Sequence, residues 1–470
     1  MIAFSLDEIA AAVRGELRLA AGDTPSTVVR GVVDTDSRAM APGGVFVAKP
    51  GETTDGHLFV PAAVEAGAVL AIVERPVDAD VTQIVVDDVV AAIADLAREN
   101  VSRARALGRI RVVGITGSNG KTTTKNMLRE ILSRRGETVA PVASYNNAVG
   151  APLTMLKVTD TTEFLVCEFG ADAPGQIARL AGLVAPDVGV VLMVGLSHAG
   201  GFGGIEHTAR AKRELVEAIR PGGTAVLNVD DARVAAMAGA AAERRAGVRF
   251  FGESEAADVR ASGLDVTADG TRSVVSIDGH RRELFLRILG AHHVKNALAA
   301  ITAAHALGVP VGDAIAAIEG MQLAERWRMQ VMGSDRVRII NDAYNASPDA
   351  MQAALRTLAQ ITKPGERMVA VLGAMSELGE HDVEEHQKIG LLAVRLRIPR
   401  IVVVGSEARP LFLSAVAEGS WSDEAVFFAT ADEAYEYLRG ELRDGDRVLV
   451  KSSNAAGLRF LGDRLGESFS

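Results

Sequence analysis

The sequence feature that most constrains this chain is a glycine-rich loop between a predicted strand and a predicted helix, at residues 110–124. Residues 112–115 include three β-branched side chains, which favour a strand, and Gly117, Gly120, Lys121 and Thr122 follow. Unpaired amides at a helix N-terminus point at an anion, glycine lets the backbone approach it, lysine adds a positive charge, and a threonine hydroxyl can bind Mg²⁺. We therefore predict a phosphate-binding loop for ATP.

The loop departs by one position from the common pattern G-x-x-x-x-G-K-[ST]. That pattern needs a glycine at position 115, where this chain has Ile115, and the nearest glycine is Gly114. A glycine-rich turn with a surface lysine is the alternative, but it does not explain why strand, loop, Gly-Lys-Thr and helix occur in this order. The predicted nucleotide contacts in the loop are Gly117, Ser118, Asn119, Gly120, Lys121, Thr122 and Thr123.

Composition places the chain among globular proteins. It has 470 residues, 48% hydrophobic and 23% charged, with a net charge of −10, so nucleic acid is not an expected partner. The single cysteine, Cys167, excludes an internal disulfide and fits a reducing compartment. The N-terminus lacks the regions of a signal peptide, and the longest apolar run, 188–196, is too short to cross a bilayer. We expect a cytoplasmic protein without membrane insertion.

The patterning predicts an α/β fold of three domains. Residues 1–106 read as a small α/β domain that ends in a helix at 88–106. In residues 107–326 strands and helices alternate, which predicts a mostly parallel sheet with helices on both faces; short alternating segments at 247–290 predict an antiparallel patch before the last helix. Residues 327–470 alternate similarly, which favours a doubly wound, Rossmann-like sheet.

Three side chains that can take part in chemistry follow successive elements of the middle domain. Glu168 ends the strand 164–168, His198 follows the apolar strand 188–194, and Lys212 lies on a helix that begins near Glu206. Each alone could be structural: a helix cap, a hydrogen-bonded loop histidine, a solvated lysine. Because ligands gather at the carboxyl ends of parallel strands, we expect all three near the loop, with Glu168 able to hold Mg²⁺.

Polar residues in turns mark candidate binding groups in the other regions. Ser37 and Arg38 follow Asp36, and His57 follows Asp55-Gly56, all in predicted turns, where helix or strand capping is the alternative reading. Asn296, at a helix start, offers the donor and acceptor that an adenine edge needs, but it could also be a cap. Strand ends and turns of the third domain carry Arg328, Asp342, Asn345 and Lys451, which could face the middle domain across a cleft.

Several motifs together resemble the Mur ligase family. The loop at Thr116–Thr123 is similar to the loop of Mur ligases and folylpolyglutamate synthases, and three further segments look like family motifs: Ser144–Pro152, Phe169–Ile177 and Leu372–Gly379. The segment 342–349, Asp-Ala-Tyr-Asn-Ala-Ser-Pro-Asp, is the most discriminating, because it resembles the branch of the family that adds a dipeptide. The resemblance covers nearly the whole chain.

The resemblance implies an ATP-dependent ligase of peptidoglycan synthesis that joins D-alanyl-D-alanine to UDP-N-acetylmuramoyl-tripeptide, ending in lysine or diaminopimelate, through an acyl phosphate. It implies one domain each for UDP, ATP and dipeptide, two Mg²⁺ ions and a monomer. The residues carried over are Lys121, Thr122 and Asn147 around phosphate, with Lys121, Glu168, His198 and Lys212 catalytic; Thr122, Glu168, His198 and a carbamylated Lys212 at metal; and Asn296, Arg328 and Asp342 on the nucleotide. The predicted substrate contacts are Ser37, Arg38 and His57 in the UDP domain, and Tyr344, Asn345 and Ser347 in the third domain.

The sequence departs from the family pattern at two places. Asn341 stands where many members have aspartate, and residues 451–454 read Lys-Ser-Ser-Asn where many read Lys-Gly-Ser-Arg. Two alternatives stay open: a ligase of this family that adds glutamate or a diamino acid, and a P-loop protein that uses nucleotide as a switch. The switch leaves residues 36–57 and 342–348 without a role.

Overall fold

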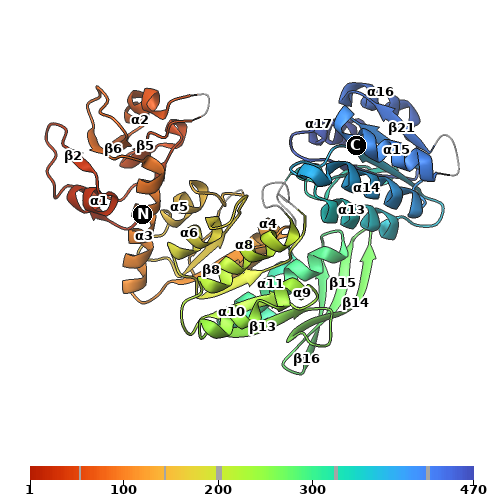
Figure 1. Ribbon diagram of the computed structural model, residues 1–470, viewed down its shortest axis with the longest axis horizontal. Helices are drawn as coiled ribbons and strands as arrows, with labels where there is room; N and C mark the ends of the chain where they lie inside the picture. The colour runs from red at the N-terminus through yellow and green to blue at the C-terminus, as the bar shows by residue number, and fades with distance from the viewer. Residues whose placement is uncertain (52–53, 142–143, 197–203, 322–325, 420–423) are drawn as a thin grey trace.

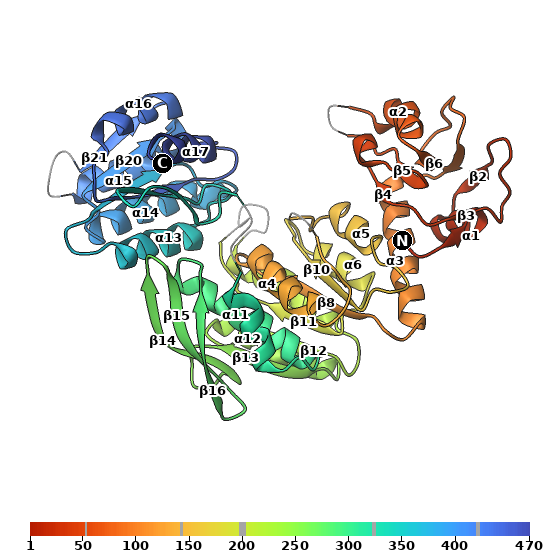
Figure 2. The same ribbon diagram turned by 180° about the vertical axis from the view of Figure 1, so that it is seen from behind.

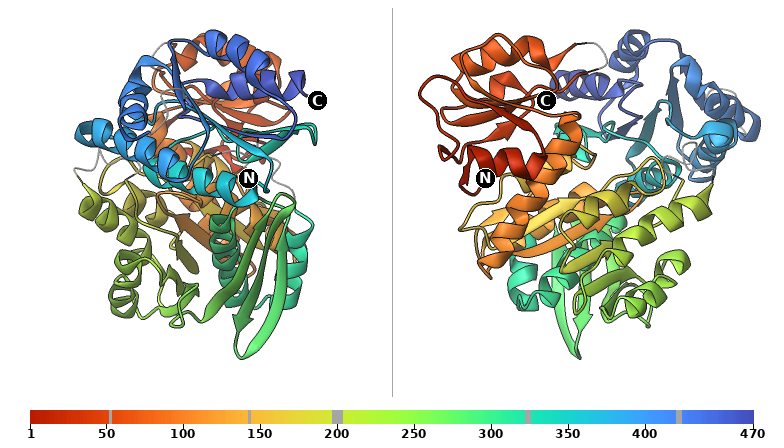
Figure 3. Two further views of the ribbon diagram at one scale, coloured as in Figure 1. Left: turned by 90° about the vertical axis from the view of Figure 1, so that its right-hand side faces the viewer. Right: turned by 60° about the vertical axis from the view of Figure 1, so that its left-hand side comes forward.

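The structure, a computed structural model, describes residues 1–51, 54–141, 144–196, 204–321, 326–419 and 424–470. Over these residues the chain forms three α/β units in sequence, and Figure 1 shows the first and third at opposite ends of the central one. Figure 2 shows the same arrangement from behind, and Figure 3 shows the central unit below the other two. The predicted three-domain α/β architecture is confirmed.

The first unit is built on a small, mostly parallel sheet. Its strands, in spatial order, are β2 (Glu16–Arg18), β7 (Thr82–Val85), β6 (Ala68–Val73), β5 (Gly44–Val47) and β4 (Val33–Asp34), and only β2 is antiparallel to its neighbour. A separate pair joins β1 (Phe4–Ser5) to β3 (Val28–Val29). The helices are α1 (Leu6–Val13), α2 (Val60–Glu65) and α3 (Val89–Ala106).

Helix α3 joins the first unit to the central one. It packs against α1 on one side and α5 (Gly150–Met155) on the other, and one hydrophobic core runs through both units. Within it Asn100 is fully buried: its Oδ1 accepts from the N–H of Ile2 at 2.9 Å, and its Nδ2 donates to the carbonyls of Met155 and Val158 at 3.0 and 3.1 Å. A single side chain therefore ties both units together.

The central unit contains a nine-stranded sheet. Its order is β16 (His280–Leu286), β15 (Gly270–Ile277), β14 (Val259–Thr267), β13 (Gly247–Gly252), β12 (Thr224–Asn228), β11 (Val188–Val191), β8 (Arg111–Thr116), β10 (Phe164–Glu168) and β9 (Thr138–Val139). Neighbours from β9 to β14 are parallel, whereas β15 and β16 are antiparallel. The mostly parallel sheet is as predicted.

Helices cover both faces of this sheet. One face packs against α4 (Lys121–Ser133), α11 (Ala291–Ala306) and α12 (Val311–Glu319); the other packs against α5, α6 (Gln176–Gly182), α8 (Ile205–Glu217) and α10 (Ala238–Glu243), with the short α9 (Ala232–Ala235) near its edge. In three details the structure corrects the sequence reading. The antiparallel strands extend the main sheet, α12 follows the helix expected to be last, and β11 ends at Val191 because the next backbone groups bond to the loop after β8.

The third unit is a doubly wound sheet, as predicted. Its order is β17 (Gln330–Gly333), β18 (Val337–Asn341), β22 (Asp446–Lys451), β19 (Arg367–Leu372), β20 (Arg400–Val404) and β21 (Ala425–Phe428), and only β17 is antiparallel. Helices α13 (Pro348–Ile361), α14 (Asp382–Arg395) and α15 (Arg409–Glu418) cover one face, and α16 (Ala431–Glu441) and α17 (Leu458–Ser468) the other. The sequence reading missed the edge strands β17 and β21, whose residues are partly buried or, at Val331, exposed.

Among the helices that the structure describes, none is both long and apolar enough to cross a membrane.

The role of Asn100 can be tested by stability. Replacing it with leucine leaves an N–H and two carbonyls without their partners, so we expect Asn100→Leu to lower the free energy of unfolding by about 3 kcal/mol. Urea denaturation measures this change. Ser102→Ala, at an exposed position on the same helix, is the control and should change stability by less than about 0.5 kcal/mol. Equal effects of the two variants would contradict the role assigned to Asn100.

Candidate active site

The loop between β8 and α4 has the geometry of an anion cradle. Gly120 precedes the first residue of α4 and has φ of +85°, in the left-handed region. A Cβ at this position would lie 2.3 Å from Oδ1 of Asn296. Gly117, with φ of +154°, would place a Cβ 2.8 Å from that of Leu192. Both positions therefore require glycine, and the amides of the first turn of α4 stay accessible to a ligand.

Lys121 lies folded back over this loop. Its Nζ donates to the carbonyl of Gly117 at 2.6 Å. Desolvation lowers the pKa of Lys121, the negative charge of Glu168 acts in the opposite direction, and the positive charge of Arg328 lowers it further. A bound phosphate chain would place negative charge beside this ammonium group and so favour its charged form.

Glu168, at the end of β10, stands next to the loop with one oxygen unsatisfied. Its side chain is 1% exposed, and Oε1 accepts from Nδ2 of Asn146 at 2.9 Å and from Oγ1 of Thr122 at 3.4 Å. Its Oε2 is buried and has no hydrogen bond to any described residue. Burying a carboxylate oxygen without a partner is costly, and carboxylate and hydroxyl oxygens are the ligands that Mg²⁺ prefers. The donors present therefore fit a Mg²⁺ ion.

Lys212 is brought to the same region by α8. It is 2% exposed, and burial lowers its pKa to about 7, with the positive charge of Lys121 lowering it further and the charge of Asp172 opposing the shift. A large fraction of this amine is therefore neutral near pH 7. The sequence reading placed Lys121, Glu168 and Lys212 near one another, and the structure does bring them together.

The remaining predicted residue of this group, His198, falls within 197–203, outside the described residues. The segment leading to it is held against the loop: Oγ of Ser118 accepts from the N–H of Gly195 at 2.8 Å and lies 3.2 Å from its carbonyl oxygen.

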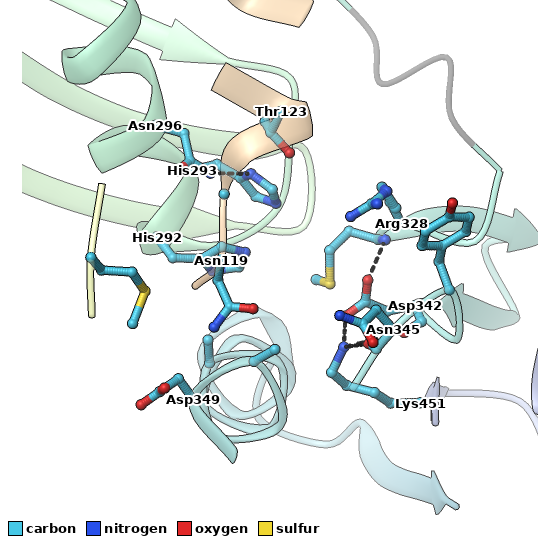
Figure 4. Close-up of a pocket in the computed structure, with 16 residues that line it drawn as sticks. Asn119, Thr123, His292, His293, Asn296, Arg328, Asp342, Asn345, Asp349 and Lys451 are labelled. Atoms are coloured by element: carbon cyan, nitrogen blue, oxygen red, sulfur yellow. Dashed lines mark hydrogen bonds and ion pairs between the residues drawn. The ribbon is translucent and has the colours of Figure 1, made fainter. Parts of the chain in front are cut away.

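A cleft opens beside the loop between the central and third units (Figure 4). One wall is formed by the loop and the start of α11, and the other by the third unit. Among the predicted site residues the lining includes Asn119, Gly120, Thr123, Asn296, Arg328, Asp342, Tyr344 and Asn345. Residues from sequence positions more than 200 apart thus share one cavity.

The third-unit wall of the cleft is a charged network. Lys451 Nζ donates to Oδ2 of Asp342 at 2.6 Å and to the carbonyl of Asn345 at 3.0 Å, while Oδ1 of Asp342 accepts from the N–H of Met329 at 3.0 Å. The guanidinium of Arg328 lies 4.2 Å from the ring centroid of Tyr344. This wall offers both cationic and hydroxyl groups to a ligand.

The two walls are in contact at Ser347 of the third unit. Ser347, which caps α13, also donates from its Oγ to Oδ1 of Asn119 at 3.2 Å. Around this contact Nδ2 of Asn119 and Nε2 of His293 are buried without a hydrogen bond to any described residue. Such polar atoms normally have partners, so their position in the cleft points to a bound polar ligand.

The structure also identifies site residues that the sequence reading missed. Asn146 bonds to Glu168, whereas Oδ1 of the predicted Asn147 accepts from the N–H groups of Val149 and Gly150 and caps α5. His292 and His293 line the cleft, and burial lowers the pKa of His292 to about 4 and that of His293 well below its usual value. The sequence does contain an Asn-Asn pair at 146–147 and a His-His pair at 292–293. A pair of identical residues, however, does not indicate which of the two side chains faces the site.

In the first unit the predicted contacts are of two kinds. Ser37 begins a 3₁₀ turn, and the exposed Arg38 pairs with Asp36 at 2.7 Å. His57, by contrast, is 3% exposed: its Nε2 accepts from the N–H of Glu74 at 2.9 Å, so Nδ1 donates to Asp55 at 2.7 Å. Both ring nitrogens are used inside the protein, so His57 supports its loop and offers no group to a substrate.

The close approach at Gly120 gives a direct test of the loop. Gly120→Ala would force a left-handed residue into contact with Asn296, so we expect nucleotide affinity to fall at least about tenfold and Tm to drop. Isothermal calorimetry with ADP and thermal melting measure both. Gly182→Ala, at an open position at the end of α6, is the matched control and should leave both unchanged or raise Tm slightly. Unaltered ADP binding by Gly120→Ala would exclude this loop as the phosphate site.

Comparison with known proteins gives matches along the chain. Residues 31–111 match the Mur ligase family catalytic domain, residues 115–304 the Mur ligase middle domain, and residues 327–454 the Mur ligase, glutamate ligase domain. The UDP-N-acetylmuramoyl-tripeptide–D-alanyl-D-alanine ligase of Mycobacterium leprae is 40% identical, with 93% of each chain covered.

Solved structures agree with this assignment. The crystal structure of MurF from Acinetobacter baumannii matches with a TM-score of 0.88 at 30% identity, covering 99% of each chain. MurF ligase from Thermotoga maritima, solved in complex with ADP, matches with a TM-score of 0.79 at 28% identity over 93% of this chain and 97% of that one. With its anion-binding loop, its shared cleft and these relatives, the chain belongs to the Mur ligase family.

Proposed function

We propose that this chain is the ATP-dependent ligase that joins D-alanyl-D-alanine to UDP-N-acetylmuramoyl-tripeptide, giving the pentapeptide precursor of peptidoglycan, ADP and phosphate. The observation that carries the proposal is the cleft in which the phosphate loop faces the segment 342–349 of the third unit. Support comes from relatives named for this activity, which match over nearly their whole length. A ligase for a single amino acid on the same scaffold is the alternative.

The chemistry explains why cations are gathered here. A carboxylate is a poor electrophile, so the tripeptide carboxylate must first attack the γ-phosphorus of ATP to form an acyl phosphate. The amine of the dipeptide then attacks the carbonyl carbon, and phosphate leaves. Because the first step brings two anions together, Lys121 and the amides of α4 would hold the transferred phosphoryl group and offset its charge.

Thr122 and Glu168 would hold a Mg²⁺ ion, which when bound neutralises charge on the phosphates. Asn146 would orient Glu168 by its bond to Oε1. His198 is proposed as a further metal ligand on the resemblance alone, and a second Mg²⁺ would involve Lys212.

Lys212 would contribute as a carbamate. A neutral amine attacks CO₂, forms a C–N bond and releases one proton, which converts a cation into an anionic metal ligand. Burial of Lys212 favours the neutral amine that this step needs. The modified side chain would then balance the positive charge of Lys121 and of a second metal ion.

The other substrates would bind on the outer units. Ser37 and Arg38 are accessible for the uridine-diphosphate end, and Tyr344, Asn345 and Ser347 would receive the dipeptide. Asn296, Arg328 and Asp342 would contact the nucleotide from both walls of the cleft. We assign these tasks to residues 1–106, 107–326 and 327–470, and propose that the third unit closes over ATP through the Ser347–Asn119 contact.

Phosphate release tests the reaction. With ATP and UDP-muramoyl-tripeptide we expect rapid release only when D-alanyl-D-alanine is added, and none of this stimulation with glutamate or diaminopimelate. Lys121→Ala should reduce the rate at least about 100-fold, because a group that offsets transition-state charge is lost. Stimulation by an amino acid in place of the dipeptide would favour the alternative ligase. Nucleotide-dependent complex formation without substrate-dependent release would indicate a switch.

The role of Lys212 can be tested separately. We expect Lys212→Ala to lower kcat at least about 100-fold and added short carboxylic acids to restore part of it, since they replace the carbamate. In the unaltered protein, activity at fixed bicarbonate should rise as pH passes through about 7, because the ammonium there gives way to the amine. Arg213→Ala, an exposed cation on the same helix, is the control. A fully active Lys212→Ala protein would rule out the carbamate.

A further inference from the structure

An acidic residue that is not among those lining the cleft contacts the start of the third unit. Asp463, on α17, has a side chain only 12% exposed. It accepts from Nη2 of Arg326 at 2.7 Å, from Nε1 of Trp327 at 2.9 and 3.1 Å, and from Nδ2 of Asn341 at 3.1 Å. One carboxylate therefore joins the last helix of the chain to two segments that lead into the cleft.

The first of these segments is strained. Trp327 and Met329 have φ of +64° and +48°, in the left-handed region that bulky residues rarely adopt. They flank Arg328, whose guanidinium lies over Tyr344 in the cleft. Strained backbone persists only where the surroundings hold it. The indole N–H of Trp327 donates to Asp463, and its backbone N–H donates to Oε1 of Gln330.

The second segment is the end of β18. Asn341 is fully buried, donates to Asp463 and to the carbonyl of Arg459, and immediately precedes Asp342 of the cleft. Gly462 lets the helix approach, since a Cβ there would lie 2.4 Å from Nδ2 of Asn341. An aspartate at position 341 would set two carboxylates against each other, so the amide at 341 and the acid at 463 are chemically matched.

We propose that Asp463 is a positioning residue: by fixing Trp327 and Asn341 it sets the placement of Arg328 and Asp342 in the cleft. The effect on catalysis rests on the proposed function, because Arg328 and Asp342 are there assigned to the nucleotide. The effect on Trp327 does not rest on the proposed function, because the environment of Trp327 is a property of the protein alone.

Tryptophan fluorescence tests the structural half. The sequence has two tryptophans, so Trp421→Phe leaves Trp327 as the only reporter. In this background we expect Asp463→Asn to increase acrylamide quenching of Trp327 at least about twofold, because the charged acceptor of the indole N–H is lost. Glu467→Gln, an exposed acid on the same helix, should leave quenching unchanged. Equal quenching in all three proteins would overturn the proposal.

A double-mutant cycle tests the functional half. We expect Asp463→Asn to raise the KM for ATP and the Kd for ADP roughly tenfold with little change in the KM for D-alanyl-D-alanine, and to add nothing once Arg328 is replaced by alanine. Additive effects of the two substitutions would show that Asp463 does not act through Arg328 and would overturn the proposal. If Arg328→Ala alone leaves ADP binding unchanged, the nucleotide assignment of Arg328 fails, and the quenching result then decides whether Asp463 positions Trp327.

The hydrogen bond between Asn341 and Asp463 gives a further test of the proposal. Asn341→Asp should weaken ADP binding through repulsion with Asp463, and Asp463→Asn added to it should recover part of the loss by restoring one donor and one acceptor. Failure of the second substitution to recover any affinity would contradict a direct match between these side chains.

Discussion

The site depends on a stretch of backbone without side chains, which a chain of phosphate groups can approach closely. This is possible because Gly117 and Gly120 have no side chains where Leu192 and Asn296 come close, so the first turn of α4 stays open. The protein carries a net charge of −10 overall, yet the positive charge of Arg328 contributes to lowering the pKa of Lys121. Local cations and oriented amides therefore act against the average charge of the molecule.

The same loop organises what surrounds it. Ser118 holds Gly195, Asn119 meets Ser347 of the third unit, and Thr122 reaches Glu168. Residues 118, 119 and 122 thus contact the segment that follows β11, another unit and a candidate metal ligand. In the proposed function, a substitution in the loop would therefore change phosphate binding, metal binding and the contact between units together.

Sequence patterns predicted the three sheets well because hydrophobic periodicity and turn residues are local properties. They also placed Glu168 and Lys212 near the loop, since strand ends meet at one edge of a parallel sheet. They did not predict side-chain orientation: His57 turns into the protein, and Asn146, which was not among the predicted residues, reaches Glu168. The direction in which a side chain points cannot be predicted from the local spacing of residues, and neither can the long-range hydrogen bonds of Asp463.

The buried amide of Asn100 has a consequence for the binding of a long substrate. One core and one set of bonds unite the first two units, so Asn100 links the unit that carries Arg38 to the unit that carries Lys121. In the proposed function, a substrate whose uridine end binds the first unit would extend from there to the loop of the central unit. The length of its peptide stem would then decide whether its carboxylate reaches the γ-phosphate.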